Sequence, residues 1–247
     1  MTNQPTRLQE TLYHDWLLPA ETLEIRAELR RFVDAELMPV AGQLNTVVET
    51  VDAFPRELFL RMAEAGLFGL PFSQADGGRG LHHPLCAATV AMEELAYASD
   101  GVATIFDDHC ALPGIALLYA PEPLRGRYLR PLIDGSAIAC MAITEPGAGS
   151  DLGLDTVQTR AESRGGCYVI NGHKRFITNA PVGDFMTTLC VADGALAMIV
   201  IDIDTPGVTV GPPDQKTGNR VQLTADVWLE DARVPKDRLL GSLGDGL

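Results

Sequence analysis

The stretch that decides the fold reads Met141-Ala142-Ile143-Thr144-Glu145-Pro146-Gly147-Ala148-Gly149-Ser150-Asp151. It begins inside an apolar run, residues 138–143, that is long enough for one β-strand, and it continues as a polar, glycine-containing loop. Before this stretch the hydrophobic residues recur with a helical period, and after it they mostly alternate as they do in strands. A change of period at such a loop predicts a domain junction that carries a binding site.

The composition indicates a globular protein with a substantial core, because 46% of the 247 residues are hydrophobic. With 19 basic against 33 acidic residues the net charge is −14, which argues against a nucleic-acid-binding surface and an anionic membrane surface. No apolar run approaches the ~20 residues of a membrane span, and residues 1–9 carry no export or organelle signal. The five widely spaced cysteines predict reduced thiols in a cytoplasmic protein.

The first half of the chain has the hydrophobic period of amphipathic helices. The predicted helices span residues 21–38, 55–65, 84–98, 101–119 and 121–133. Pro39 is expected to stop the first of them. Between the second and third helices, residues 67–72 read as a short extended run and residues 76–80 as a turn.

Two of these helices carry specific expectations. In the third, the inward-facing residues are expected to be Leu85, Ala88, Met92 and Leu95. The fourth is apolar on most sides, which is typical of a buried helix. Asp107, Asp108 and His109 lie in its middle, so these polar side chains need partners or a ligand.

The second half of the chain reads as strands at residues 137–144, 156–162, 167–170, 175–178, 185–192, 195–203, 208–210 and 227–230. Asp193-Gly194 is a strong hairpin signal between two of them. Short strands at this spacing favour a small antiparallel barrel or sandwich. The predicted fold class is therefore α+β, an N-terminal all-α helical domain followed by a small antiparallel β-barrel or sandwich domain.

Several common site motifs fail on spacing. Leu152 occupies the position of the third glycine of a dinucleotide-binding G-x-G-x-x-G motif, and no Walker A pattern occurs. Ser150 is not flanked by the two glycines of a nucleophile elbow. His82, His83 and Cys86 lack a credible set of further ligands, so no metal site is predicted.

Residues 142–151 resemble the signature of the acyl-CoA dehydrogenase family of flavoproteins. The segment 170–180, Ile-Asn-Gly-His-Lys-Arg-Phe-Ile-Thr-Asn-Ala, is similar to the family's second flavin segment. Further agreement occurs in the same order at residues 67–71, 77–80, 93–96, 204–207, 234–235 and 239–241. The resemblance covers nearly the whole chain from Glu21 onward.

The resemblance implies FAD as the cofactor, with its isoalloxazine ring against the β-domain. The implied flavin-contacting residues are Met141, Ala142, Ile143, Thr144, Gly149 and Ser150 near the pyrimidine side, and Phe176, Ile177 and Thr178 near the other face and the N5 edge. Hydrogen bonds from Thr144, Thr178 and loop amides would stabilise charge on the flavin as hydride arrives. Phe176 stands where many members of the family have tryptophan, and it can pack on the ring.

The resemblance also implies substrate contacts. Ser150 matches a position that contacts acyl-CoA, and Asp107 and Asp108 resemble positions near the bottom of the acyl pocket. Two acids facing that pocket would disfavour a long alkyl chain. Glu145 and Asp151 are expected to bond backbone amides and shape the loop rather than to act as bases.

The family fold implies an N-terminal helical domain at residues 1–135 and a middle β-domain at 136–238 that contacts flavin. Residues 239–247 would begin a linker to a C-terminal helical bundle that is absent from this sequence. The implied reaction is α,β-dehydrogenation of an acyl-CoA thioester, with hydride transfer to flavin N5 and onward transfer of electrons to an electron-transferring flavoprotein. Because the family's base lies in the C-terminal domain, no catalytic residue is named here, and the isolated chain is expected to be inactive. A homo-oligomer, dimer or tetramer, is also implied.

Two alternative functions remain open at this point. One is a related flavoenzyme on the same scaffold: an acyl-carrier-protein dehydrogenase, an acyl-CoA oxidase or a flavin monooxygenase. The other is a non-catalytic subunit of such an assembly. The chain is read as a piece of a longer enzyme or as a naturally short subunit that needs a partner.

Overall fold

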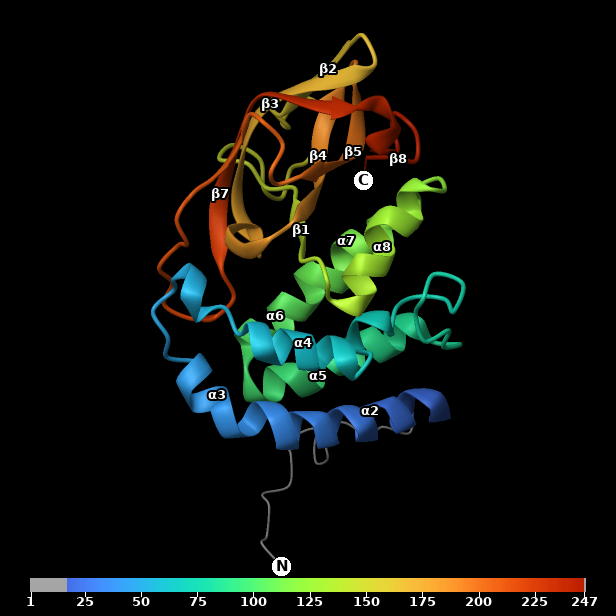
Figure 1. The fold of residues 1–247 in the computed structure, drawn as a ribbon, viewed down its shortest axis with the longest axis vertical. Coiled ribbons are helices and arrows are strands. Elements are labelled where there is room, and N and C mark those ends of the chain that lie inside the picture. Colours follow the sequence, from blue (N-terminus) through green and yellow to red (C-terminus); the bar gives the residue numbers. More distant parts are fainter. Residues whose placement is uncertain (1–16, 247) are drawn as a thin grey trace, which may run out of the picture.

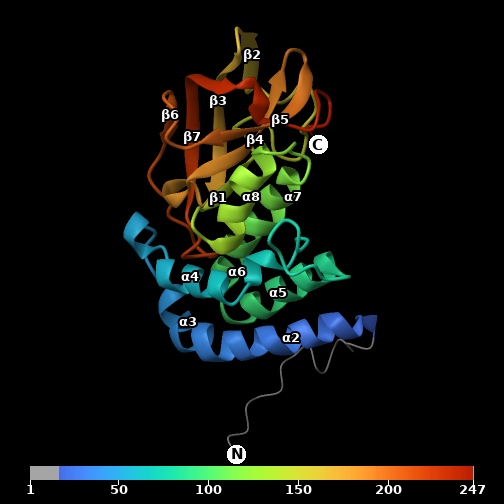
Figure 2. The same cartoon turned by 45° about the vertical axis from the view of Figure 1, so that its right-hand side comes forward.

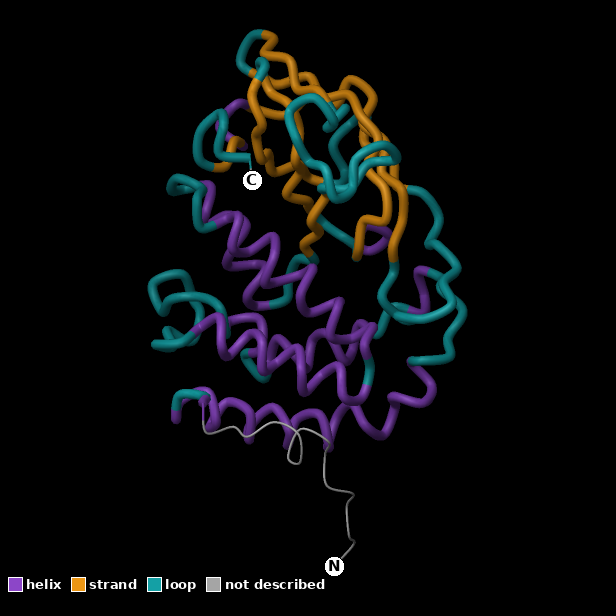
Figure 3. Tube along the Cα trace, turned by 180° about the vertical axis from the view of Figure 1, so that it is seen from behind, coloured by secondary structure: helices purple, strands orange, loops and turns teal. Residues whose placement is uncertain are grey.

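The computed structural model describes residues 17–246. Residues 1–9, on which the prediction about an export signal rests, lie outside the described part. The helices gather at one end of the molecule and the strands at the other (Figures 1 and 3). Within the described residues, no helix is long and apolar enough to cross a membrane.

Helices occupy the first half of the described chain. They are α2 (Ala20–Phe32), η2 (Val33–Leu37), α3 (Met38–Leu44), η3 (Val51–Ala53), α4 (Arg56–Glu64), η4 (Leu67–Gly69), α5 (Pro84–Ala98), α6 (Asp100–Phe106), η5 (Asp107–Ala111), α7 (Leu112–Leu117) and α8 (Leu124–Asp134). The α5 helix coincides with the third predicted helix, and α6, η5 and α7 form one continuous helical run that corresponds to the fourth.

The prediction that Pro39 stops the first helix is wrong. The chain stays helical through η2 and α3, and Pro39 lies in the first turn of α3. The η2 segment is a single π-helical turn, in which the Met38 amide donates to the Val33 carbonyl just before the proline. In a first turn, the missing N–H of a proline removes no hydrogen bond from the helix.

Two smaller predictions about the helical half are also wrong, the second of them for one residue only. Residues 67–72 are not extended, because Gly66 turns the chain in the left-handed region (φ +70°) into the 3₁₀ turn η4. Leu85 is 62% exposed, so its predicted burial is wrong, whereas Ala88 and Leu95 are buried and Met92 is partly buried, as predicted. Apolar residues lie on most sides of α5, so its period does not single out one face.

The strands are β1 (Ala139–Ala142), β2 (Arg160–Arg164), β3 (Cys167–Thr178), β4 (Phe185–Ala192), β5 (Ala195–Asp202), β6 (Val208–Val210), β7 (Thr224–Pro235) and β8 (Leu239–Leu240), with the 3₁₀ turns η6 (Ala180–Val182) and η7 (Lys236–Arg238) between them. They form one sheet in the order β6-β7-β3-β2-β4-β5-β8, with β1 paired to β4. Most pairings are antiparallel, as predicted, and two are parallel, β1–β4 and β2–β4. The predicted α+β fold class is confirmed.

The strand boundaries differ from the prediction where polar residues find distant partners. Residues 171–174 do not interrupt a strand, because β3 runs through them with bulges at 170/172 and 174/177. Residues 156–159 are not a strand, because two amides there bond the side chain of Glu145 instead of a neighbouring strand. The Asp193-Gly194 hairpin is confirmed, with both residues at positive φ (47° and 87°).

The helical and sheet parts share one hydrophobic core. Phe185, Leu189 and Met198 of the sheet belong to the same buried cluster as the helical side chains, and a second cluster fills the sheet itself. Figure 2 shows α7 and α8 lying against the sheet end of the molecule. The Tyr128 hydroxyl of α8 donates a hydrogen bond to Asp202 Oδ1 of β5 (2.6 Å), which ties the two parts at their boundary.

Candidate functional site

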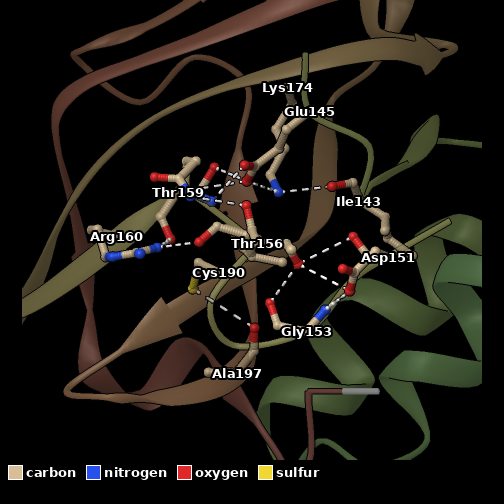
Figure 4. A network of polar contacts seen from close by, with 12 residues as sticks. Ile143, Glu145, Asp151, Gly153, Thr156, Thr159, Arg160, Lys174, Cys190 and Ala197 are labelled. Atoms are coloured by element: carbon tan, nitrogen blue, oxygen red, sulfur yellow. Dashed lines mark hydrogen bonds and ion pairs between the residues drawn. The ribbon is translucent and has the colours of Figure 1, made fainter. Parts of the chain in front are cut away.

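The loop that follows β1 is closed on itself and fastened by a buried carboxylate (Figure 4). The Glu145 amide donates to Ala148 O (2.8 Å), and the Ala148 amide donates back to Glu145 O (3.2 Å). The Glu145 carboxylate accepts hydrogen bonds from the amides of Gln158 (2.6 Å) and Thr159 (3.0 Å) and from Thr159 Oγ1 (2.6 Å). Asp151 Oδ1 accepts from the Gly153 amide (3.1 Å). The prediction that both acids bond backbone amides is confirmed.

A buried lysine faces this carboxylate. Lys174 of β3 is fully buried, and its Nζ donates to Glu145 Oε1 (2.8 Å) and to the carbonyl oxygen of Ile143 (2.9 Å). Burial acts to raise the pKa of Glu145, but hydrogen bonds from Lys174, Thr159 and Gln158 outweigh it and lower that pKa. Burial lowers the pKa of Lys174, and Glu145 opposes this shift. The result is an ion pair sealed beneath the loop.

Sequence reasoning did not single out Lys174 as a site residue. The signal was weak, because Lys174 shares its parity with the apolar Tyr168 and Ile170, but Val169 of the opposite parity is buried as well. A lysine on the apolar face of a strand needs a buried partner, and here the partner lies 29 residues earlier in the chain.

The outer side of the loop is open. A Cβ atom built on Gly147 or Gly149 would meet nothing within 4 Å, and neither glycine has a positive φ. Nothing in the described chain therefore requires a glycine at these two positions. Within the described residues, the Thr144 amide also makes no hydrogen bond, whereas the Thr144 carbonyl accepts one from the Arg175 amide (2.8 Å). Ser150 is exposed at the end of the loop.

Phe176 projects from a strained point of β3. It lies in the bulge between Lys174 and Ile177 at φ +60°, and its side chain is 56% exposed with the Arg175 guanidinium 4.8 Å from the ring centre. A bulky residue in the left-handed region is unusual and costs free energy, which is typical of functional positions. Its neighbours Ile177 and Thr178 are buried.

Asp107 and Asp108 lie in the π-helical turn η5, and Asp108 contacts Thr178 of β3. The Thr178 hydroxyl donates to the Asp108 carboxylate and accepts a hydrogen bond from Gln222 Nε2 (2.7 Å). Burial, together with the nearby Asp107 charge, raises the pKa of Asp108 to about 6. Burial also raises the pKa of Asp107. The structure thus joins Asp108 to Thr178, two predicted site residues, through a hydrogen bond.

His109, the third polar residue of this turn, is fully buried and satisfied by backbone groups. Its Nε2 lies 2.9 Å from Leu132 O and its Nδ1 accepts from the Ala139 amide (3.1 Å), so that Nε2 carries the proton. Burial lowers the pKa of His109 to about 3. The neutral ring therefore connects α8 to the start of β1.

An apolar cavity of about 650 Å³ lies between α7 and the sheet. Met141 and Ile143 of the predicted set face it. The other lining residues come from α7 and the turn after it, from β5 and β8, and from the end of the described chain: Leu112, Ile115, Ala116, Tyr119, Met198, Leu240, Gly244, Asp245 and Gly246. Asp107 and Asp108 are not among its lining residues. The side chain of Ala142 is buried inside the sheet, so only its backbone is available to a ligand.

Within residues 17–246, no group of three or more histidine, cysteine or acidic side chains is placed to hold a metal ion. All five cysteines are free, and Cys86 is exposed.

Comparison with known proteins agrees with this geometry. Residues 19–136 match the N-terminal domain of acyl-CoA dehydrogenases, and residues 140–232 match their middle domain. The human mitochondrial short-chain specific acyl-CoA dehydrogenase is 33% identical over 247 residues, which cover 97% of this chain and 58% of that protein. The CarC subunit of the caffeyl-CoA reductase–Etf complex of Acetobacterium woodii is 34% identical over 229 residues, or 90% and 58%.

Solved structures show the same fold. A glutaryl-CoA dehydrogenase from Mycobacterium smegmatis, determined in complex with FADH2, superposes with a TM-score of 0.84 at 26% identity, covering 96% of this chain and 59% of that one. The chain thus spans about three fifths of the length of the relatives it matches. Two consecutive domain matches, a shared fold and the loop geometry lead to one assignment: the chain belongs to the acyl-CoA dehydrogenase family.

Proposed function

We propose that the protein is an FAD-dependent acyl-CoA dehydrogenase, which oxidises the α,β-bond of an acyl-CoA thioester. The observation that carries this proposal is the loop after β1, which is fixed from below by Glu145 and Lys174 and left open above Gly147 and Gly149. Open glycines beside a free amide suit the close approach of a flat, polar ring. The exposed Phe176 supplies an aromatic surface at the same site.

Each proposed contact has a physical role. Bound FAD would supply the two-electron acceptor for the hydride of the substrate's β-carbon. The amide and hydroxyl of Thr144 and the loop amides at Gly149 and Ser150 orient the flavin and stabilise negative charge on its pyrimidine side. Met141 of β1 and Ile177 of β3 would contact the ring, Ile177 through its backbone because its side chain is buried. We assign the α-proton to no residue of this chain.

The apolar cavity beside Met141 and Ile143 suits an acyl chain, because ligand pockets of this size are mostly apolar with a few polar groups at one end. Ser150 is the proposed contact to the CoA side of the substrate. Asp107 and Asp108 do not line this cavity, so a preference for short acyl groups is not part of the proposal.

The proposed electron acceptor is an electron-transferring flavoprotein, which is supported by the relative that forms a complex with Etf. The proposed domains are residues 1–135 and 136–238. The five free thiols support a reducing, cytoplasmic location. Assembly into a homodimer or homotetramer is part of the same proposal.

A second candidate is the reverse reaction, reduction of an α,β-unsaturated acyl thioester. It is favoured by the name of the Acetobacterium relative, a caffeyl-CoA reductase subunit, which is as similar to this chain as the human dehydrogenase is. Both directions use the same flavin contacts. Which direction runs depends on the thioester that binds and on the protein that exchanges electrons with the flavin.

The test starts with FAD binding by the chain and continues with the full-length gene product under anaerobic conditions. Saturated acyl-CoAs of increasing length should bleach the absorbance of bound FAD, whereas an α,β-unsaturated thioester should reoxidise reduced flavin if the reductase direction holds. Rapid reaction of the reduced flavin with oxygen would instead identify an oxidase or monooxygenase. A chain that binds no FAD contradicts the proposal.

Changing Gly149 to alanine should weaken FAD binding about tenfold or more, because an added methyl group costs about 1–3 kcal/mol in a tightly packed contact. The same change should leave folding intact or stabilise it by roughly 0.4–1 kcal/mol, since the new Cβ meets nothing in the chain. Fluorescence quenching of FAD and urea unfolding measure the two effects.

The matched control is Gly166→Ala, at a turn between β2 and β3 where a new Cβ likewise meets nothing and φ is not positive. This variant should bind FAD as the unchanged protein does. Equal FAD affinity for both variants would mean that the flavin does not approach Gly149.

Replacing Phe176 with glycine should weaken FAD binding roughly five- to tenfold, since an aromatic contact contributes about 0.5–1.5 kcal/mol beyond its buried area. Stability should change by less than about 1 kcal/mol, because relief of the positive φ offsets the backbone entropy of glycine. Phe176→Trp should retain binding. FAD titration of both variants checks this, and tight binding by the glycine variant contradicts a stacking role.

A further inference from the structure

One peptide group of the site has an unusual electrostatic environment. The carbonyl of the Ile143–Thr144 peptide accepts a hydrogen bond from the Lys174 ammonium at 2.9 Å (Figure 4). The N–H of the same peptide belongs to Thr144 and has no hydrogen-bond partner within residues 17–246. A cation is therefore held at one end of the peptide, and a donor without a hydrogen-bond partner in the described residues stands at the other.

A cation on a carbonyl oxygen draws electron density from the attached amide and makes its N–H a stronger donor, because hydrogen bonds in a chain polarise one another. The effect is large here because Lys174 has no exposed side-chain surface and Glu145 is only 4% exposed, so water does not screen the charge. An exposed lysine at the same distance would be screened by water.

The pair is not explained by stability alone. Burying a lysine and a glutamate costs desolvation that their attraction only roughly offsets, and two apolar residues of similar volume often serve folding equally well. Glu145 also holds the strand-to-loop turn through Gln158 and Thr159, which fixes the lysine against Ile143 and prevents it from reaching solvent. The arrangement delivers a fixed positive charge to one chosen peptide.

We propose that Lys174, held in place by Glu145, is a positioning residue that polarises the Ile143–Thr144 peptide, so that the Thr144 amide donates a strengthened hydrogen bond to the electron-rich edge of the flavin. This inference rests on the proposed function, because it needs a bound flavin. The strengthened hydrogen bond stabilises the two oxidation states of the flavin unequally. The reduced flavin carries more negative charge than the oxidised form, so the strengthened donor favours the reduced form and raises the reduction potential of the bound cofactor.

The decisive variant is the double change Lys174→Met/Glu145→Gln, which removes both charges and retains side chains of similar volume. Each single change leaves one buried charge without its partner and should lower the unfolding midpoint. The double variant should recover most of that stability. It should nevertheless bind FAD about tenfold more weakly than the unchanged protein and show a lower flavin reduction potential, because no cation remains on the Ile143 carbonyl.

The control is the ion pair between Arg164 and Glu162, which lies exposed on β2 of the same sheet. The corresponding double change Arg164→Met/Glu162→Gln should alter neither FAD affinity nor flavin potential. A purely structural role for Lys174 predicts that its double variant recovers stability, affinity and potential together, and that result would overturn the inference.

The unchanged protein provides a second test that needs no variant. In a ¹⁵N-labelled sample, the Thr144 amide proton should move downfield when FAD binds and further downfield when the flavin is reduced. A Thr144 resonance that does not respond to bound flavin overturns the inference, while FAD binding itself still supports the proposed function. A protein that binds no FAD contradicts the proposed function instead, so the two failures are distinguishable.

Discussion

Replacing His109 with alanine is expected to destabilise the protein by about 3–5 kcal/mol, the range for truncating a large buried aromatic side chain. The ring packs edge-on against Phe59 and Phe68, with centroid distances of 4.7 and 4.3 Å. Its removal leaves a cavity there. It also deprives the Leu132 carbonyl and the Ala139 amide of their partner, and each unsatisfied buried group adds to the cost. Because these groups belong to α8 and β1, the connection between the helices and the sheet weakens.

Urea unfolding of the unchanged protein and of the His109→Ala variant measures this loss of stability. The control is His83→Ala, which truncates an exposed histidine just before α5 and should change the unfolding free energy by no more than about 0.5 kcal/mol. Equal stability of the His109 and His83 variants would contradict the bridging role of His109.

Changing Asp108 to asparagine is expected to stabilise the protein by about 3 kcal/mol at pH 7.5, and the gain should vanish near pH 4. Burial raises the folded-state pKa of Asp108 to about 6, against an ordinary value of 3.8. At pH 7.5 the folded protein therefore holds an unfavourable charge that the unfolded chain holds at no cost, a difference of about 3 kcal/mol. Asparagine removes the charge and its Oδ1 still accepts the Thr178 hydroxyl.

The pH dependence follows from which state binds the proton. As the pH falls through 6, the folded protein protonates Asp108 before the unfolded chain does, so this group makes the protein more stable toward low pH. His109 acts in the opposite direction. Its pKa is about 3 when folded and 6.5 ordinarily, so below pH 6.5 the unfolded chain takes up a proton that the folded protein does not. Between pH 6 and 4 the two effects nearly cancel.

The Asp108→Asn variant should therefore show the pH dependence that His109 gives to the unfolding free energy. Its unfolding free energy should fall with decreasing pH by about 1.4 kcal/mol per pH unit more steeply than that of the unchanged protein between pH 5.5 and 4.5. Urea unfolding at several pH values checks this. Asp155→Asn, at an exposed position in the loop before β2, serves as the control and should run parallel to the unchanged protein. Parallel curves for the Asp108 variant would contradict the raised pKa.

Elements with strong local signals were predictable from the sequence. The α5 helix, with a proline in its first turn, matches its prediction, as do β4 and β6. The hairpin at Asp193-Gly194 was also predictable, because few residues other than glycine, asparagine and aspartate adopt two consecutive positive φ angles. In each case the determinant lies within a few residues of the element.

The errors in the sheet half have a common cause, which is a partner far away in the chain, whereas those in the helical half arise locally at η2, Gly66 and α5. Residues 156–159 fail to form a strand because Glu145 takes their amides, and β3 continues through its polar middle because Lys174 and His173 find partners in Glu145 and Asp226. Periodicity records which face of an element is apolar, but it carries no information about what lies opposite that face.

By itself, the sequence determined the fold class and the family, and it predicted the segments of the candidate site, because residues 142–151 and 170–180 are continuous and specific. Only the tertiary structure decided how these segments act together. It places the Lys174 ammonium under the Ile143 carbonyl, joins Asp108 of a π-helical turn to Thr178, and leaves the side of the loop at Gly149 open. A buried charge is tolerated only where packing brings it a partner, and that partner is set by the fold rather than by neighbours in sequence.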